Sequence, residues 1–211
     1  MKNLKELIQH QCVSKAKDFE TLKESISKNI NGRICHHNVK ILNLLVDLYD
    51  IKTYLEIGVH NGTSMSYIVH QNKSVECIGI DLFESTTKQY KPDDLLIERT
   101  TINIESNNKG NSTISFITGN SQNKETISKL ESKIKEESID LLFIDGDHSY
   151  QGIKLDFNNY TKFVKPGGFI VIDDYNKRWP DIIKFCDNEI DTTKFEKIGL
   201  FFNNELLIKK L

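Results

Sequence analysis

The chain has 211 residues, of which 38% are hydrophobic and 27% are charged. A chain of this length can bury a sizeable core without disulfides, so we expect a single globular unit. Lys and Arg (28) nearly balance Asp and Glu (30), which argues against a large nucleic-acid-binding surface. The sequence contains no long apolar run and no signal peptide, and it predicts a soluble, cytoplasmic protein without a membrane partner.

The first 50 residues are predicted to be helical. Amphipathic patterns cover residues 4–30, with an interruption, and residues 38–49. We expect residues 1–50 to form a helical cap or a lid over a ligand site, and residues 51–211 to form the main domain. The amphipathic helices also leave open a homo-oligomer.

From about residue 39, short β-branched or aromatic runs alternate with helical patterns. This order is typical of a doubly wound α/β fold, a mostly parallel sheet with helices on both faces. We expect strands at 53–58, 75–83, 113–119, 139–146 and 168–175, and helices at 63–70, 92–105, 124–137, 150–164 and 180–189. KIGLFFN and ELLIKK, joined at Asn203 and Asn204, predict a final antiparallel hairpin, which gives seven strands in all.

An acid and a glycine turn follow one another at the end of the first predicted strand. Glu56 and Gly58 open the run EIGVHNG, which ends at Gly62, and Thr63 and Ser64 begin the next helix. The glycines let the backbone approach a ligand closely, and the hydroxyls can cap the helix and donate hydrogen bonds. The GxxxG spacing is not the GxGxxG of dinucleotide-binding proteins and argues against a pyrophosphate cradle.

Asp81 ends the second predicted strand, where an acid can accept hydrogen bonds from both hydroxyls of a ribose. EIGVHNG and GIDLF together resemble the class I S-adenosylmethionine-dependent methyltransferases. In that family the glycine turn wraps the amino-acid end of the cofactor and the acid holds its ribose. The resemblance, which includes the KPGG turn at 165–168 and the hairpin, implies a Rossmann-like fold and puts Leu82 in the cofactor site beside Asp81.

Asn120 and Ser121 follow the third predicted strand, where the family often has a Gly-Asp pair that contacts the adenine amino group. The amide carbonyl of Asn120 can still accept a hydrogen bond from that amine. The alternative is that Asn120 is an ordinary turn residue.

A second group of polar residues ends the fourth and fifth predicted strands. Asp145 and His148 follow the fourth strand, and Asp173 and Asp174 follow the fifth. Because neighbouring parallel strands lie about 4.8 Å apart, these carboxylates can converge on one ion. Oxygen ligands without a nearby thiol favour Mg²⁺, with Mn²⁺ or Ca²⁺ as substitutes. The alternative is that Asp173 and Asp174 only cap a turn or the next helix.

LLFIDGDHSYQGIKLDF and KPGGFIVIDDY resemble a metal-dependent O-methyltransferase subgroup that includes macrocin O-methyltransferase and relatives described as cephalosporin hydroxylases. The resemblance implies that Asp145, Asp173 and Asp174 bind the metal. Some members have Glu at the position of Asp173. Asp145 is also assigned to catalysis and to the cofactor site, and His148 is the candidate general base. A histidine pKa near 6.5 suits that role, although a His beside a turn is often only a hydrogen-bonding spacer.

These motifs predict a Mg²⁺-assisted O-methyltransferase that uses S-adenosylmethionine. By resemblance the acceptor is a hydroxyl of a sugar or glycosylated small molecule, and a catechol-type phenol is the second choice. Two alternatives remain open, namely a cofactor-binding protein without turnover and a nicotinamide-dependent oxidoreductase, although the GxxxG spacing and the hairpin argue against the latter.

Overall fold

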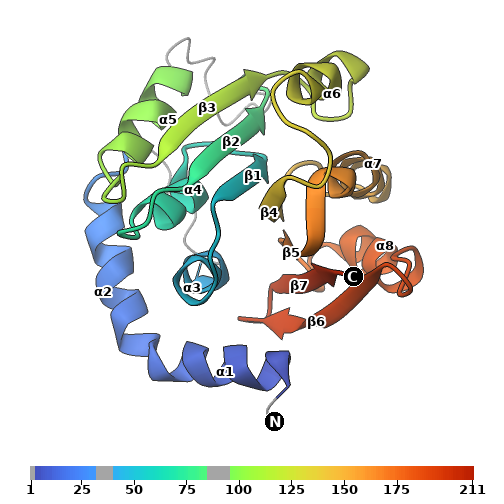
Figure 1. The fold of residues 1–211 in the computed structure, drawn as a ribbon, viewed down its shortest axis with the longest axis horizontal. Coiled ribbons are helices and arrows are strands. Elements are labelled where there is room, and N and C mark those ends of the chain that lie inside the picture. The colour runs from blue at the N-terminus through green and yellow to red at the C-terminus, as the bar shows by residue number, and fades with distance from the viewer. Residues whose placement is uncertain (1–2, 32–39, 85–95) are drawn as a thin grey trace.

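The computed structural model describes residues 3–31, 40–84 and 96–211 (Figure 1). In this part of the chain the strands form a seven-stranded sheet with the order β3-β2-β1-β4-β5-β7-β6. Strands β1 to β5 run parallel to one another, and β7 is antiparallel to both of its neighbours, β5 and β6. The strands are β1 Thr53–Ile57, β2 Glu76–Asp81, β3 Thr113–Thr118, β4 Ile139–Ile144, β5 Val164–Ile172, β6 Phe195–Phe201 and β7 Glu205–Lys210. The predicted doubly wound sheet with a final hairpin is confirmed.

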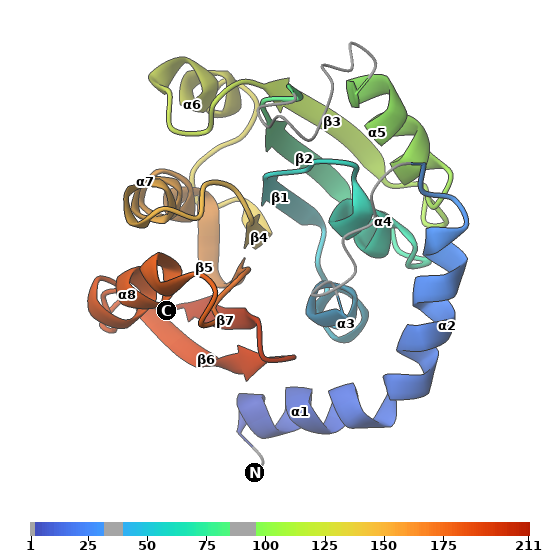
Figure 2. The same ribbon diagram turned by 180° about the vertical axis from the view of Figure 1, so that it is seen from behind.

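Helices cover both faces of the sheet (Figure 1, Figure 2). They are α1 Leu4–Ser14, α2 Ala16–Ser27, α3 Lys40–Leu48, α4 Thr63–Val69, α5 Leu96–Glu105, α6 Lys124–Glu131, α7 Tyr150–Tyr160 and α8 Pro180–Asn188. The five helices from α1 through α5 pack on one face of the sheet in one hydrophobic cluster. Helices α6, α7 and α8 pack on the other face in a second cluster. Alternate side chains of each strand enter different clusters, which is why the strands are nearly continuous apolar runs.

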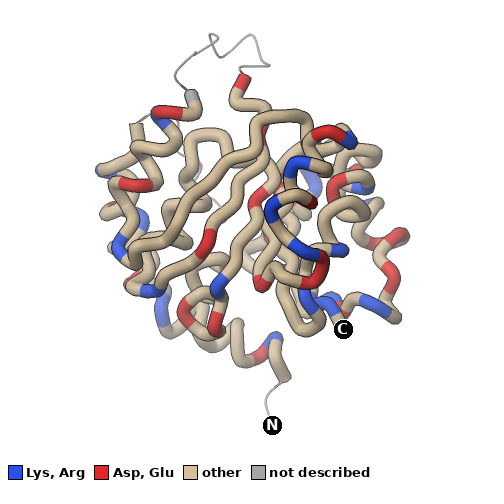
Figure 3. Tube along the Cα trace, turned by 45° about the horizontal axis from the view of Figure 1, so that its top comes forward, with Lys and Arg blue, Asp and Glu red and all other residues tan. Residues whose placement is uncertain are grey.

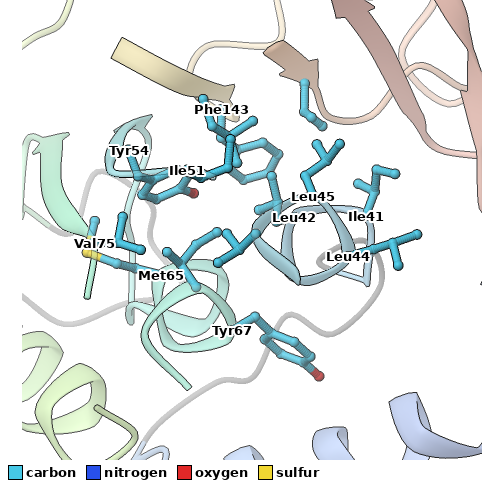
Figure 4. Packing of buried hydrophobic residues seen from close by; sticks show 14 of the residues in the cluster. Ile41, Leu42, Leu44, Leu45, Ile51, Tyr54, Met65, Tyr67, Val75 and Phe143 are labelled. Atoms are coloured by element: carbon cyan, nitrogen blue, oxygen red, sulfur yellow. The ribbon is translucent and has the colours of Figure 1, made fainter. Parts of the chain in front are cut away.

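Helix α3 lies inside the first cluster. Its residues Ile41 to Val46 are buried. Figure 4 shows Leu42 and Leu45 on the side of the helix that faces Tyr54 of β1, Phe143 of β4 and Met65 of α4. Helices α1 and α2 run along the outside of the molecule (Figure 2), but each also contributes buried residues to this cluster. The N-terminal helices therefore share a core with the sheet.

Several elements differ in length from their prediction. Helix α6 ends at Glu131, and α7 ends at Tyr160, where a single 3-10 turn over Thr161–Phe163 follows. Strand β5 begins at Val164 and includes the KPGG turn, because Val164 pairs with Ile139 before the register shifts. Residues 38–39 and 92–95 of two predicted helices lie outside the described residues.

The charged residues are mixed in sign over the molecule. Figure 3 shows Lys and Arg interspersed with Asp and Glu along the traced elements. Among the described helices, none has the length and apolar character needed to cross a bilayer.

Candidate cofactor and metal site

The loop after β1 is shaped by two glycines with positive φ, 89° at Gly58 and 75° at Gly62. A Cβ at Gly58 would overlap the carbonyl oxygen of Asp145, and one at Gly62 would come within 2.6 Å of the Ile104 side chain in α5. The sequence predicts that these glycines admit a ligand. In the structure the missing side chains also leave room for the end of β4 and for helix α5, so the loop packs directly on both.

Asp81 fastens this loop to the end of β2. Its Oδ2 accepts hydrogen bonds from the backbone N–H groups of Val59 (2.7 Å) and His60 (2.8 Å), and its Oδ1 accepts one from Phe83 (2.7 Å). A carboxylate has about four acceptor positions, so a ribose hydroxyl can still bind. Leu82, which follows, is 38% exposed.

Glu56 lies fully buried behind the loop. It accepts hydrogen bonds from the hydroxyls of Tyr54 (3.0 Å) and Ser64, the second residue of α4. Burial raises the pKa of Glu56 to about 8, although these two hydrogen bonds oppose the rise. Glu56 therefore holds Ser64, at the start of α4, by a hydrogen bond, and it supports the loop from the buried side.

Thr63 is the residue of this loop that has an unused polar atom. It is 5% exposed, and its Oγ1 has no hydrogen-bond partner among the described residues. Helix α4 is capped by Gly62 without a side-chain hydrogen bond. A buried hydroxyl without a partner is costly, and a polar ligand at the start of α4 would satisfy it. This position fits the amino-acid end of an S-adenosyl cofactor.

The turn after β3 is held by hydrogen bonds to other protein groups. The Oδ1 of Asn120, the atom predicted to accept from adenine, accepts from the backbone N–H of Gln122 (2.8 Å), as an ordinary turn residue would. Ser121 donates from its Oγ to Asp156 Oδ1 (2.7 Å). The structure thus gives Asn120 a local role and connects Ser121 to α7.

The acidic residues converge at the carboxyl ends of β4 and β5. His148 Nε2 lies 3.2 Å from Asp145 Oδ1 and 3.5 Å from Asp174 Oδ2, and ligand atoms of the three residues lie within 4.8 Å of one another. Asp173 is not in this group. Its Oδ1 accepts from Asn204 Nδ2 (2.5 Å) and from the backbone N–H of Asp174 (2.7 Å). Asp173 nevertheless lies beside the group, since its side chain also shares a hydrogen bond with Asp145, and its assignment to the metal stays a prediction.

The charges of this group shift its protonation. Burial raises the pKa of Asp145, and the charge of Asp174 adds to that rise, whereas His148 opposes it. Burial alone would lower the pKa of His148, but the hydrogen bond and charge of Asp145, together with Asp174, raise it. The ring of Trp179 lies 4.4 Å from the His148 ring, between centroids, and forms an apolar wall beside it.

A fourth carboxylate lies buried near this group. Glu205, the first residue of β7, is 0% exposed, and neither of its oxygens has a hydrogen-bond partner among the described residues. Burial, followed by the charge of Asp173, raises the pKa of Glu205 to about 10. Clustered carboxylates with an imidazole and an unsatisfied buried acid form a donor set that fits a hard divalent cation.

Comparison with known proteins decides the family. Residues 55–175, more than half of the chain, match the family described as Methyltransferase domain. The chain belongs to this methyltransferase family. It is also 34% identical over 191 residues to the uncharacterized protein R132 of Acanthamoeba polyphaga mimivirus, a match that covers 85% of this chain and 82% of that protein.

Solved structures share the fold. A protein from Staphylococcus aureus described as a candidate caffeoyl-CoA O-methyltransferase superposes with a TM-score of 0.63, at 15% identity, over 96% of this chain and 98% of the other. The O-methyltransferase from Bacillus cereus, solved in complex with SAH, gives a TM-score of 0.61 at 15% identity, over 94% and 91%. The predicted fold and the resemblance to class I methyltransferases are confirmed.

Sequence reasoning missed three polar residues around the site. Asp156 lies in the buried stripe of α7 between Ile153 and Tyr160, and its signal was an acid at an apolar position of a helix. Glu205 lies two residues before buried Leu207, on the same face of β7, so the strand period places it on a buried face. Asn204 had no such signal, because its contact with Asp173 depends on how the hairpin meets β5.

Proposed function

We propose that this protein transfers a methyl group from S-adenosylmethionine to a hydroxyl oxygen, with the help of a divalent metal. The observation that carries the proposal is the convergence of Asp145, His148 and Asp174 beside a glycine loop in a methyltransferase-family chain. Gly58 packs on the carbonyl of Asp145, so the proposed cofactor loop and the proposed metal group are neighbours. A methyl donor and a chelated hydroxyl held there would meet.

The residues divide the work as follows. Asp81, Thr63 and the loop of Gly58 and Gly62 would bind the cofactor. Asp145 and Asp174, with Asp173 beside them, would hold the metal. When bound, the cofactor supplies an electrophilic methyl group on sulfur, and Mg²⁺ makes the acceptor hydroxyl more acidic. The protein contributes alignment of the two reactants and a low-dielectric site.

His148 is proposed to take the proton that leaves the acceptor hydroxyl. At Nε2 the proton would lie between Asp145 Oδ1 and Asp174 Oδ2, which stabilise the imidazolium form. The raised pKa of His148 makes the ring a stronger base than an isolated histidine. Trp179 limits the positions that the ring can adopt.

The proposed acceptor is a hydroxyl of a sugar or glycosylated small molecule. The S. aureus protein, whose description refers to caffeoyl-CoA, supports a phenol as the second candidate. Residues 1–50 are proposed to border the acceptor as a cap. In support, α1 approaches the acidic end of the sheet, since the charge of Glu205 adds to the burial that raises the pKa of Cys12 to about 11.

The test is a calorimetric titration with S-adenosylhomocysteine, with and without Mg²⁺, and with NADH as the control. We expect micromolar binding of S-adenosylhomocysteine and none of NADH. Mg²⁺-dependent methylation is then measured on panels of sugars and catechols. Binding of NADH in preference would overturn the proposal in favour of an oxidoreductase. Binding of S-adenosylhomocysteine with no transfer to either panel would favour a protein without turnover.

A further inference from the structure

Helix α7 carries a carboxylate at a position where its neighbours are apolar. Asp156 is 0% exposed and lies in one buried stripe with Ile153, Phe157 and Tyr160. Placing an ionisable acid in such a stripe costs free energy, since the charged form loses its water. An apolar residue there would pack at a lower cost, so the acid calls for a role beyond packing.

Asp156 and Tyr160 hold one residue of the turn after β3 at two points. Ser121 Oγ donates to Asp156 Oδ1 (2.7 Å), and Tyr160, one helical turn later, donates from its hydroxyl to the Ser121 carbonyl oxygen (2.6 Å). Both the side chain and the backbone of Ser121 are therefore fixed by α7. This turn is the part of the proposed cofactor site that faces adenine.

The second oxygen of Asp156 lies under the loop after β4. A Cβ added to Gly146 would come within 2.8 Å of Oδ2, so the glycine gives this oxygen its space. Oδ2 has no hydrogen-bond partner among the described residues. The carboxylate thus stands between two loops, one with Ser121 and one with Gly146, and both belong to the proposed cofactor site.

We propose that Asp156 is a positioning residue whose ionised carboxylate holds the Ser121 turn against the loop of Gly146 and makes cofactor affinity depend on pH. This inference rests on the proposed binding of an S-adenosyl cofactor. Asp156 does not touch the cofactor and acts through Ser121.

The direction of the effect follows from hydrogen-bond strength. A hydroxyl bound to a carboxylate is held roughly twice as strongly as one bound to a neutral acid, so protonation of Asp156 loosens the turn. Burial raises the pKa of Asp156 to about 6, the Ser121 hydrogen bond opposes the rise, and the charge of Asp147 adds to it. Among the described residues, Asp147 is the charged group that acts on Asp156, while Ser121 and Tyr160 are neutral. Affinity should therefore fall as the pH decreases through about 6.

The experiment is calorimetry with S-adenosylhomocysteine between pH 5 and pH 8 in EDTA, with the full-length protein. We expect the wild-type dissociation constant to rise about tenfold from pH 7.5 to pH 5. In Asp156→Asn, which keeps an oxygen for Ser121 but not the charge, we expect weak binding at pH 7.5 and loss of that tenfold change. In Asp147→Asn the midpoint should move to lower pH.

Ser121→Ala tests the same link without altering the buried acid. We expect it to weaken binding at pH 7.5 about as much as Asp156→Asn, and the double variant to lose no more than either single one. His148 is a second titratable side chain near the site, and His148→Gln should keep the wild-type pH dependence of binding. If wild type and Asp156→Asn bind equally well at pH 7.5, or if the wild-type affinity does not change with pH, the inference about Asp156 is overturned while the proposed function stands. Absence of wild-type binding at every pH would overturn the proposed function with it.

Discussion

The two halves of the site satisfy their acids in different ways. In the half after β1 and β2, Asp81 accepts three backbone N–H groups and Glu56 accepts two hydroxyls. In the half after β4 and β5, Asp145 and Asp174 face the same imidazole and Glu205 has no partner among the described residues. The two acids of the first half are satisfied by protein groups alone. In the second half a divalent cation would offset the repulsion among the clustered carboxylates. The two halves should therefore respond differently to added metal.

The strongest way to break this comparison is to remove an acid from the second half. Asp174→Ala should lower turnover by about 10³-fold and abolish the rise in Tm caused by Mg²⁺, because one proposed ligand is lost. Affinity for S-adenosylhomocysteine should change less than about threefold in calorimetry. An unchanged Mg²⁺ effect on Tm would contradict the assignment of Asp174 to the metal.

The matched change in the first half is Asp81→Asn. It removes an acceptor for the loop N–H groups and a proposed acceptor for the ribose, so cofactor affinity should fall about 10- to 100-fold. The Mg²⁺ effect on Tm should be retained. Loss of both responses together would show that the two halves do not act separately.

A smaller effect concerns stability and pH. The folded-state pKa of Glu205 is raised to about 10, so the neutral acid stabilises the fold below its unfolded pKa, and this contribution is lost as the pH increases toward 10. In EDTA at pH 8.5, Glu205→Gln should raise Tm by about 5 °C, and near pH 4 it should change Tm little. Thermal unfolding followed by circular dichroism checks this, and a lower Tm at pH 8.5 would contradict it.

The smallest change in Tm is expected when the buried glutamate of the first half, Glu56, is replaced by glutamine. The pKa of Glu56 is raised to about 8, so its stability contribution is likewise lost between its unfolded value and that pH. Here the gain from removing the charge is offset, because Tyr54 and Ser64 donate to different oxygens of Glu56 and an amide has an oxygen at only one of these two positions. Glu56→Gln should therefore change Tm at pH 8.5 by less than about 2 °C.

The strand ends were predictable, whereas the hydrogen bonds between them were not. Apolar runs with an acid at their ends place Asp81, Asp145 and Asp174 at one edge of a parallel sheet, and neighbouring strands bring the last two together. Side-chain rotamers then decide which acid turns toward His148, and no spacing rule distinguishes Asp174 from Asp173. The binding of Asp81 to loop N–H groups depends on the loop conformation, which the glycines permit but do not specify.

The hairpin at residues 195–210 affects the order in which the site can assemble. Strand β7 follows all the other described strands in the sequence, yet it lies between β5 and β6 in the sheet. Its approach brings Asn204 to Asp173, across 31 residues of chain, whereas Asp81 meets the glycine loop across only 21 or 22. During folding, the loop of β1 and β2 can close within one short stretch, whereas the contacts of Asn204 with Asp173 and Asp174 form only after β7, the last described strand in the sequence, has joined the sheet. Slow strand insertion would therefore delay metal binding more than cofactor binding.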